Sequence, residues 1–243
     1  MSRDIEKYTK DYNESTFEHI QVRYRVKKVL EILEKYASKH VLEIGCGNDS
    51  VFNHYKNYLT ATVVEPSVEF ANKCKNDFCN DNQVNVICDF FENVVLKDQH
   101  FDFIILSCLL HEVEKPEHLL RCICTICDTD TVVHINVPNS RAFHLVWAYE
   151  SGLIPRLGEL TPTSKKLQQN TSFDMTKLSN MILSAGLQPI ESGSYFVKPF
   201  NHEKMSKLLE ENVIDQNLLD GLYSITKYMP DLGSEIYINA KRK

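Results

Sequence analysis

The chain has 243 residues, of which 43% are hydrophobic and 25% charged, and its formal net charge is −6. This length and hydrophobic content suffice for one large domain with a substantial core. The acidic balance disfavours a nucleic-acid partner, and no window approaches the roughly 18 apolar residues of a membrane-spanning helix. The first residues, "MSRDIEKYTKDYNE", lack the apolar segment of a signal peptide. We therefore expect a cytoplasmic protein without a membrane partner.

A helix is predicted over residues 15–37, where hydrophobic residues recur at spacings of three and four. After it, short runs rich in Val, Ile, Leu and Phe alternate with helical segments. Such runs are typical of strands buried on both faces of a parallel sheet. Their alternation with helices predicts an α/β fold with a doubly wound, mostly parallel sheet. The predicted strands cover residues 40–45, 61–65, 84–89, 101–107 and 131–137.

The pattern lapses after the fifth run, between residues 138 and 170, a segment that holds the only Trp of the chain. We expect this insertion to form a helical lid over a ligand. A helix capped by Asp174 and closed by Gly186 should follow. The remaining chain predicts two more strands, in "LQPIESGSYFVKPF" and "GSEIYINAKR", on either side of a helical stretch over residues 201–228.

The eight cysteines lie within apolar runs, where a free thiol packs as a small hydrophobic group. We expect no disulfides. The cluster "CICTIC" over residues 122–127 has no second Cys or His pair at the spacing of a zinc site, so we expect no metal.

The stretch "HVLEIGCGNDSVF", residues 40–52, places a glycine loop directly after the first predicted strand. A phosphate-binding P-loop is excluded, because no Lys follows Gly47 at the required position. A dinucleotide fingerprint is weakened but stays open, since Gly45 and Gly47 match it while Ser50 occupies the third glycine position. We expect Asp49 or Asn48 to cap the next helix.

The segment "VLEIGCG" resembles the first motif of class I S-adenosylmethionine-dependent methyltransferases. The resemblance implies that Glu43 lies near the aminopropyl end of the cofactor. It also implies that Gly45, Cys46 and Gly47 let the main chain approach this ligand, with Asn48 next to them. A residue without Cβ permits such an approach.

Two further acids end the next two predicted strands. Glu65, followed by Pro66, can accept both ribose hydroxyls, which also fits a dinucleotide. In the family, an acid at the position of Asp89 accepts from the adenine amino group, and Phe90 would pack on the ring. Asp89 can instead cap a helix that starts near residue 91. Ser107, at the end of the fourth strand, would pass beside the methionine portion.

His111 follows this strand and would be displayed near the transferred methyl group, as a general base for a hydroxyl acceptor. His134, in the middle of a predicted strand, is the weaker candidate and reads as a buried imidazole. The segment after "VPN" resembles bacterial methyltransferases that act on small metabolites or on activated sugars of surface glycans. That resemblance marks His144 as a second catalytic candidate. Substrate contacts are expected from Asn139, Arg141 and Tyr149.

The N-terminal helix, "FEHIQVRYRVKK", also resembles this set, in which the helix closes over the cofactor. Tyr24 and Arg25 would then reach the cofactor carboxylate. A solvated helix face is the alternative.

These patterns together predict a single domain with a seven-stranded sheet whose last strand is antiparallel, as the resemblance implies. An N-terminal cap (1–37) precedes the cofactor-binding half (38–137), the lid (138–170) and the C-terminal part of the sheet (171–243). The expected cofactor is S-adenosylmethionine, and the expected acceptor is a small polar molecule methylated at a hydroxyl, in polysaccharide biosynthesis or small-metabolite chemistry.

Three alternatives stay open: a quinone- or phenol-type O-methyltransferase, a non-catalytic cofactor-binding protein and an NAD-dependent oxidoreductase. An apolar, aromatic lid would favour the first of these. The sequence also leaves room for a homodimer.

Overall fold

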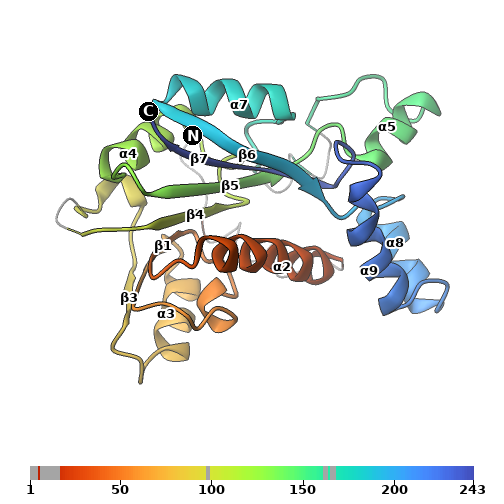
Figure 1. The fold of residues 1–243 in the computed structure, drawn as a ribbon. Helices are drawn as coiled ribbons and strands as arrows, with labels where there is room; N and C mark the ends of the chain where they lie inside the picture. Colours follow the sequence, from red (N-terminus) through yellow and green to blue (C-terminus); the bar gives the residue numbers. More distant parts are fainter. Residues whose placement is uncertain (1–4, 6–16, 97–98, 161–163, 165–167) are drawn as a thin grey trace.

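The computed structural model describes residues 5, 17–96, 99–160, 164 and 168–243. Its centre is a seven-stranded sheet in the order β3-β2-β1-β4-β5-β7-β6, shown in Figure 1. The strands pair in parallel from β3 through β5, whereas β7 is antiparallel to both β5 and β6. The predicted sheet with an antiparallel last strand is confirmed. The strands are β1 (His40–Ile44), β2 (Thr60–Val64), β3 (Val84–Ile87), β4 (Phe103–Ser107), β5 (Val132–Pro138), β6 (Leu187–Tyr195) and β7 (Glu235–Arg242).

The strand order reverses next to β1. The chain runs from β1 outward to β2 and β3, then returns to place β4 on the other side of β1. In register, Glu43 of β1 lies beside Ile105 of β4. The loops that leave β1 and β4 therefore diverge at one point of the sheet edge, which is where open α/β sheets bind ligands.

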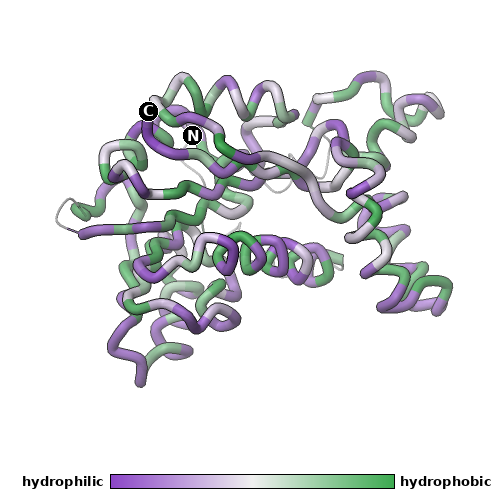
Figure 2. Tube along the Cα trace, viewed as in Figure 1, coloured by the Kyte–Doolittle hydropathy of each residue, from purple (hydrophilic) through white to green (hydrophobic). Residues whose placement is uncertain are grey.

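Helices cover both faces of the sheet. In Figure 1, α2 lies against one face, and α4 and α7 lie against the other. Hydrophobic and hydrophilic residues alternate along α2 in Figure 2, as expected for a helix with one buried face. The helices are α2 (Glu18–Tyr36), α3 (Val68–Asp77), α4 (Pro116–Ile126), α5 (Phe143–Glu150), α7 (Met175–Ser184), α8 (His202–Glu210) and α9 (Gln216–Ser224), with 3-10 turns η1 (Val51–Asn53), η2 (Phe91–Asn93) and η3 (Ile225–Lys227).

The alternation of side chains along the strands divides the buried hydrophobic residues into two cores. Val41 and Phe103 face the first core, together with Leu33 of α2. Leu42 and Ile104, their neighbours in sequence, face the second core. Because both faces of the central strands are buried, these strands have the nearly continuous apolar composition seen in the sequence.

Several local predictions are confirmed and others are wrong. The Asp174 side chain caps α7 by accepting from Lys177 N at 2.8 Å. The predicted helix over residues 201–228 is two helices, α8 and α9, separated by a turn in which Asn212 has a φ of +54°. Residues 15–16 of the predicted N-terminal helix, and residues 161–163 and 165–167 of the predicted lid, lie outside the described residues.

The predicted cap of the helix after the glycine loop is also wrong. Only the 3-10 turn η1 follows the loop, and its cap is Ser50, which accepts from Phe52 N. Asp49 instead binds the side chains of Asn53 and His54, at 2.8 and 2.7 Å.

All eight cysteines are free. Across the part of the chain that the structure describes, no group of three or more His, Cys, Asp or Glu residues could hold a metal ion. In the same part, every helix is too short or too polar to cross a membrane.

Candidate active site

A cavity of about 1200 Å³ opens at the carboxyl ends of β1, β2 and β4. One part of its wall is the glycine loop after β1 with the ends of the neighbouring strands. The other part comes from α2, from α5 and from the segment that joins β6 to α8. Twelve of the residues that the sequence predicts to bind a ligand or to act in catalysis line it: Arg25, Glu43, Gly45, Cys46, Gly47, Asn48, Glu65, Pro66, Ser107, His111, Asn139 and His144.

The glycine loop exposes main chain to this cavity. Gly45 and Gly47 have φ angles of +79° and +56°, a region that L side chains rarely adopt. A Cβ on Gly45 would lie 3.2 Å from Leu109 Cδ2, whereas a Cβ on Gly47 would meet no atom within 4 Å. The space beside Gly47 is therefore open rather than filled by packing, which suits a ligand that approaches the backbone.

Glu43 holds this loop in place. Its buried carboxylate accepts from Ser50 Oγ at 2.5 Å and from Val51 N at 3.0 Å. Burial raises the pKa of Glu43 to about 7, although both hydrogen bonds oppose the rise. A cationic group bound in the cavity would stabilise the ionised form of this side chain.

Glu65 joins the loop to the start of α3. Its carboxylate accepts from Gly47 N at 3.1 Å and from Ser67 N at 2.8 Å. A carboxylate oxygen can accept more than one hydrogen bond, so a ligand hydroxyl could donate to Glu65 as well.

Asp89 and Phe90 do not line the cavity. Asp89 is exposed and accepts from Phe90 N at 2.7 Å and from Asn93 Nδ2 at 2.8 Å, just before η2. This is close to the capping role considered from the sequence. Phe90 is 47% exposed. Both residues follow β3, which neighbours β2 in the sheet. Their contact with an adenine ring stays a prediction.

A buried polar network fixes the end of β4. Asn136 Oδ1 accepts from Cys108 N at 2.8 Å, and Ser107 Oγ contacts the same amide. Asn136 Nδ2 also lies 3.1 Å from His134 Nε2. His134 is fully buried, and burial lowers its pKa to about 4, so it is the neutral interior imidazole expected. This network supports a φ of +50° at Cys108, where the chain turns along the cavity.

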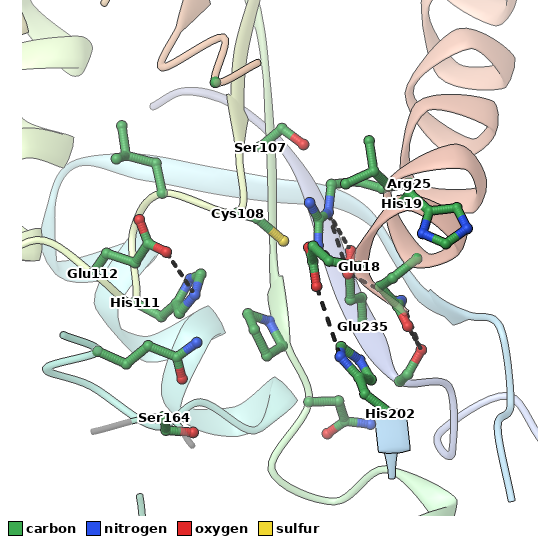
Figure 3. Close-up of a pocket in the computed structure, with 18 of the residues that line it drawn as sticks. Glu18, His19, Arg25, Ser107, Cys108, His111, Glu112, Ser164, His202 and Glu235 are labelled. Carbon is green, nitrogen blue, oxygen red and sulfur yellow. Dashed lines mark hydrogen bonds and ion pairs between the residues drawn. The ribbon is translucent and has the colours of Figure 1, made fainter. Parts of the chain in front are cut away.

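His111 and Glu112 form one wall of the cavity (Figure 3). Both side chains are buried, and His111 Nε2 lies 3.6 Å from Glu112 Oε1. The main-chain N–H groups of Asn170 and Thr171 donate to His111 O, and Asn170 Nδ2 donates to Glu112 O. The pair is therefore held between β4 and the end of the segment that follows α5.

A charged cluster forms the opposite wall in Figure 3. The Arg25 guanidinium binds Glu235 through Nη2 at 2.7 Å and Nε at 3.1 Å, and Glu18 at 3.0 Å. Tyr195 Oη and Gln21 Nε2 also donate to Glu235. Although burial alone would raise it, Arg25 holds the pKa of Glu235 below its usual value. Arg25 thus lines the cavity as predicted, but these carboxylates already engage its charge.

Lys198 and two histidines extend this wall. Lys198 is 5% exposed, and burial lowers its pKa to about 8. Burial and the nearby Lys198 charge lower the pKa of His202 to about 3 and move that of His144 well below its usual value. His202 is therefore neutral at pH 7, and its 4.0 Å contact with Glu18 is not an ion pair there.

Tyr24 is a wrong prediction. Its ring is buried between Phe196 and Tyr223, with centroids 4.4 and 5.4 Å away, and its hydroxyl donates to Asp220 at 2.8 Å. The helix turns about 100° per residue, so when Arg25 faces the cavity, its neighbour faces elsewhere.

The predicted substrate contacts are also corrected. Asn139 reaches the cavity wall, but its amide is used structurally, because Nδ2 donates to Asp231 O and Gly233 O, and Oδ1 accepts from Arg141 N, each at 2.9 Å. Arg141 is exposed and Tyr149 is 41% exposed, and neither lines the cavity.

The sequence reasoning missed Lys198, His202, Glu18 and Glu235 as wall residues. Lys198 had a usable signal, since a lone lysine interrupts the apolar run "YFVKPF". Glu235 had no such signal in the sequence, because a carboxylate at the first residue of a strand is common.

Residues 17–192 match the family described as a methyltransferase domain. This is more than half of the chain, so the chain belongs to that family. A search of curated proteins found no match.

Three solved structures share the fold. The plantazolicin methyltransferase BamL, in complex with a desmethyl analogue and SAH, is 13% identical, with 98% of this chain and 97% of BamL covered and a TM-score of 0.56. The [4+2]-cyclase SpnF is 15% identical, with 87% of this chain and 80% of SpnF covered and a TM-score of 0.58. The mitomycin 7-O-methyltransferase MmcR is 11% identical over 86% of this chain, with a TM-score of 0.53. This chain spans only 50% of the length of MmcR. The predicted family and fold are confirmed.

Proposed function

We propose that the chain is an S-adenosylmethionine-dependent methyltransferase that methylates a hydroxyl group of a small molecule. One observation carries this proposal: the glycine loop, two carboxylates at adjacent strand ends and a buried His–Glu pair all face one cavity. The family match supports methyl transfer. SpnF has this fold and is called a cyclase, so the fold does not establish the reaction.

The residues present fit the cofactor. Gly45 and Gly47 offer main chain without Cβ, and Glu43 would sit near the positively charged methionine end. Glu65 lines the same cavity, and a carboxylate at this position can accept from ribose hydroxyls. When bound, S-adenosylmethionine supplies an electrophilic methyl group. A dinucleotide fits less well, because Ser50 replaces the third glycine and its hydroxyl is committed to Glu43.

His111 would accept the proton of the acceptor hydroxyl. A neutral imidazole is a suitable base near pH 7, and Glu112, at 3.6 Å, would stabilise the imidazolium that forms. Burial of both side chains keeps competing water away. His144 is the second candidate, but its strongly lowered pKa makes it the weaker base.

The lid side of the cavity favours an acceptor with an apolar, aromatic body. Phe143, Trp147 and Phe200 form a chain of ring contacts, with centroids 5.9 and 5.3 Å apart. Of these three rings, those of Trp147 and Phe200 line the cavity, together with Leu145, Leu153 and Ile154. This lining supports the phenol-type alternative over an activated sugar of polysaccharide biosynthesis, because a sugar would leave its hydroxyls against apolar surface.

The test is transfer from methyl-labelled cofactor to matched panels of phenols and sugar nucleotides. We expect product with at least one phenol and none with the sugar nucleotides; the reverse pattern would refute the acceptor class. With an accepted phenol, His111→Ala should lower kcat at saturating cofactor by roughly a hundredfold or more. His118→Ala, on the exposed surface of α4, is the control. A kcat for His111→Ala within about threefold of wild type would remove His111 as the base.

A further inference from the structure

Lys198 is a buried ammonium group that the proposed methyl transfer does not use. It follows β6 in the segment "FVKPF", lines the cavity and is 5% exposed. Among the residues that the structure describes, it makes no hydrogen bond and no ion pair. Burying a cation without a partner is costly, so this arrangement calls for a ligand group that completes it.

The nearest carboxylates are engaged elsewhere. Glu18 and Glu235 both act on the charge of Lys198, but Arg25 binds each of them at 3.0 Å or less. Glu235 also accepts from Tyr195 and Gln21. These two carboxylates balance the charge of the wall without supplying Lys198 with a hydrogen-bond acceptor.

Two neutral imidazoles lie beside the ammonium group. His144 and His202 both respond to the charge of Lys198, and both line the cavity. The buried His144 Nδ1 has no hydrogen-bond partner among the described residues. A neutral imidazole carries one N–H donor, so the three side chains together offer several donors and one positive charge.

We infer that Lys198, assisted by His144 and His202, binds an anionic group of the methyl acceptor, a carboxylate or a phosphate. This inference rests on the proposed function, since it concerns the acceptor half of the same cavity. Charge-assisted hydrogen bonds from an ammonium group suit both anions.

The position of Lys198 assigns it to the acceptor rather than to the cofactor. His144 belongs to α5, Lys198 belongs to the segment that joins β6 to α8, and His202 is the first residue of α8. The glycine loop after β1 and Glu65 after β2, which would hold the cofactor, are on other elements. Phe200, two residues after Lys198, contacts the Trp147 ring in a tilted arrangement, with centroids 5.3 Å apart. The wall therefore fits an acceptor with an aromatic body and an anion.

The experiment uses Trp147, the only tryptophan, as a reporter. Its fluorescence is followed while the SAH-loaded full chain is titrated with benzoate, with phenyl phosphate and, as the uncharged control, with benzyl alcohol. We expect saturable binding of one or both anions, at least tenfold tighter than of benzyl alcohol. The comparison of benzoate with phenyl phosphate identifies the preferred anion.

Lys198→Met should weaken anion binding by roughly tenfold or more, as expected for the loss of a charge-assisted hydrogen bond. Lys198→Arg should restore at least part of it. Lys207→Met, on the exposed surface of α8 and outside the cavity lining, should have less than a threefold effect. Each variant's thermal unfolding and SAH affinity, measured by calorimetry, show whether it is folded.

Three outcomes would overturn the inference: no anion preference in the wild type, unchanged anion binding in Lys198→Met, or an equal loss of SAH affinity in Lys198→Met. The last would assign Lys198 to the cofactor carboxylate. Failure of the wild type to bind SAH would instead refute the proposed function, and the anion titration of the unloaded chain would still report on Lys198.

Discussion

Glu43→Gln should make the stability of the unliganded protein less dependent on pH. Burial raises the pKa of Glu43 from 4.5 to about 7, a rise of roughly 2.5 units. At about 1.4 kcal/mol per unit, the ionised carboxylate costs the folded state up to ~3 kcal/mol. Below pH 4.5 the folded and unfolded states are both protonated, so the cost is absent.

The sign follows from proton binding. Between pH 4.5 and 7 the folded state retains a proton that the unfolded state has released, so stability falls as pH rises through this window. Above pH 7 both states are ionised and the cost is complete. Glutamine cannot ionise, and its carbonyl oxygen can still accept from Val51 N. Glu43→Gln should therefore gain up to ~3 kcal/mol relative to wild type between pH 4.5 and pH 8.

Urea unfolding of the two proteins at half-unit pH steps measures this difference, and pH effects from all other groups cancel in it. Glu150→Gln, an exposed carboxyl at the end of α5, is the control and should run parallel to wild type. If the wild-type and Glu43→Gln curves stay parallel within ~0.5 kcal/mol across this window, the desolvation argument for Glu43 is refuted.

Three further variants test the placement of residues around the cavity. Gly47→Ala should raise the Kd for SAH at least roughly fivefold in calorimetry, because its Cβ would occupy open space where the ligand is expected to approach the main chain. An unchanged Kd would contradict the loop geometry. Tyr24→Phe should lower the free energy of unfolding by about 1 kcal/mol, because the hydrogen bond to Asp220 is lost, and should leave the Kd for SAH within twofold of wild type. A tenfold higher Kd would restore Tyr24 to the cofactor site. Asn139→Ala should cost about 2 kcal/mol or more in urea unfolding, since it leaves Asp231 O, Gly233 O and Arg141 N without their partner; a cost below ~0.5 kcal/mol would contradict its structural role.

The fold was predictable because its signals are local and repeated. Strands buried on both faces need apolar residues at every position, and the runs ending at Glu43 and Glu65 show this directly. Asp174 was predictable as a cap because it directly precedes a helical period. The glycine loop was harder, because Ser50, rather than Asp49, both caps the next turn and binds Glu43.

The acceptor wall was the least predictable part of the site. Arg25 and Tyr24 both lie in the N-terminal helix segment that resembles the family. Only the rotation of α2 against its neighbours decides which one reaches the cavity. Lys198 and His144 are far apart in sequence and meet through tertiary packing alone. Periodicity locates secondary structure, but it carries no information on such long-range encounters.

The central claim is that the cavity at the ends of β1, β2 and β4 is an S-adenosylmethionine site. Calorimetric titration of the wild type and Glu65→Ala with SAH, and with NADH for comparison, tests it most directly. We expect one SAH per chain with a micromolar or tighter Kd, at least tenfold weaker binding to Glu65→Ala, and no binding of NADH. Absence of SAH binding to the folded wild type, or tighter binding of NADH than of SAH, would contradict it.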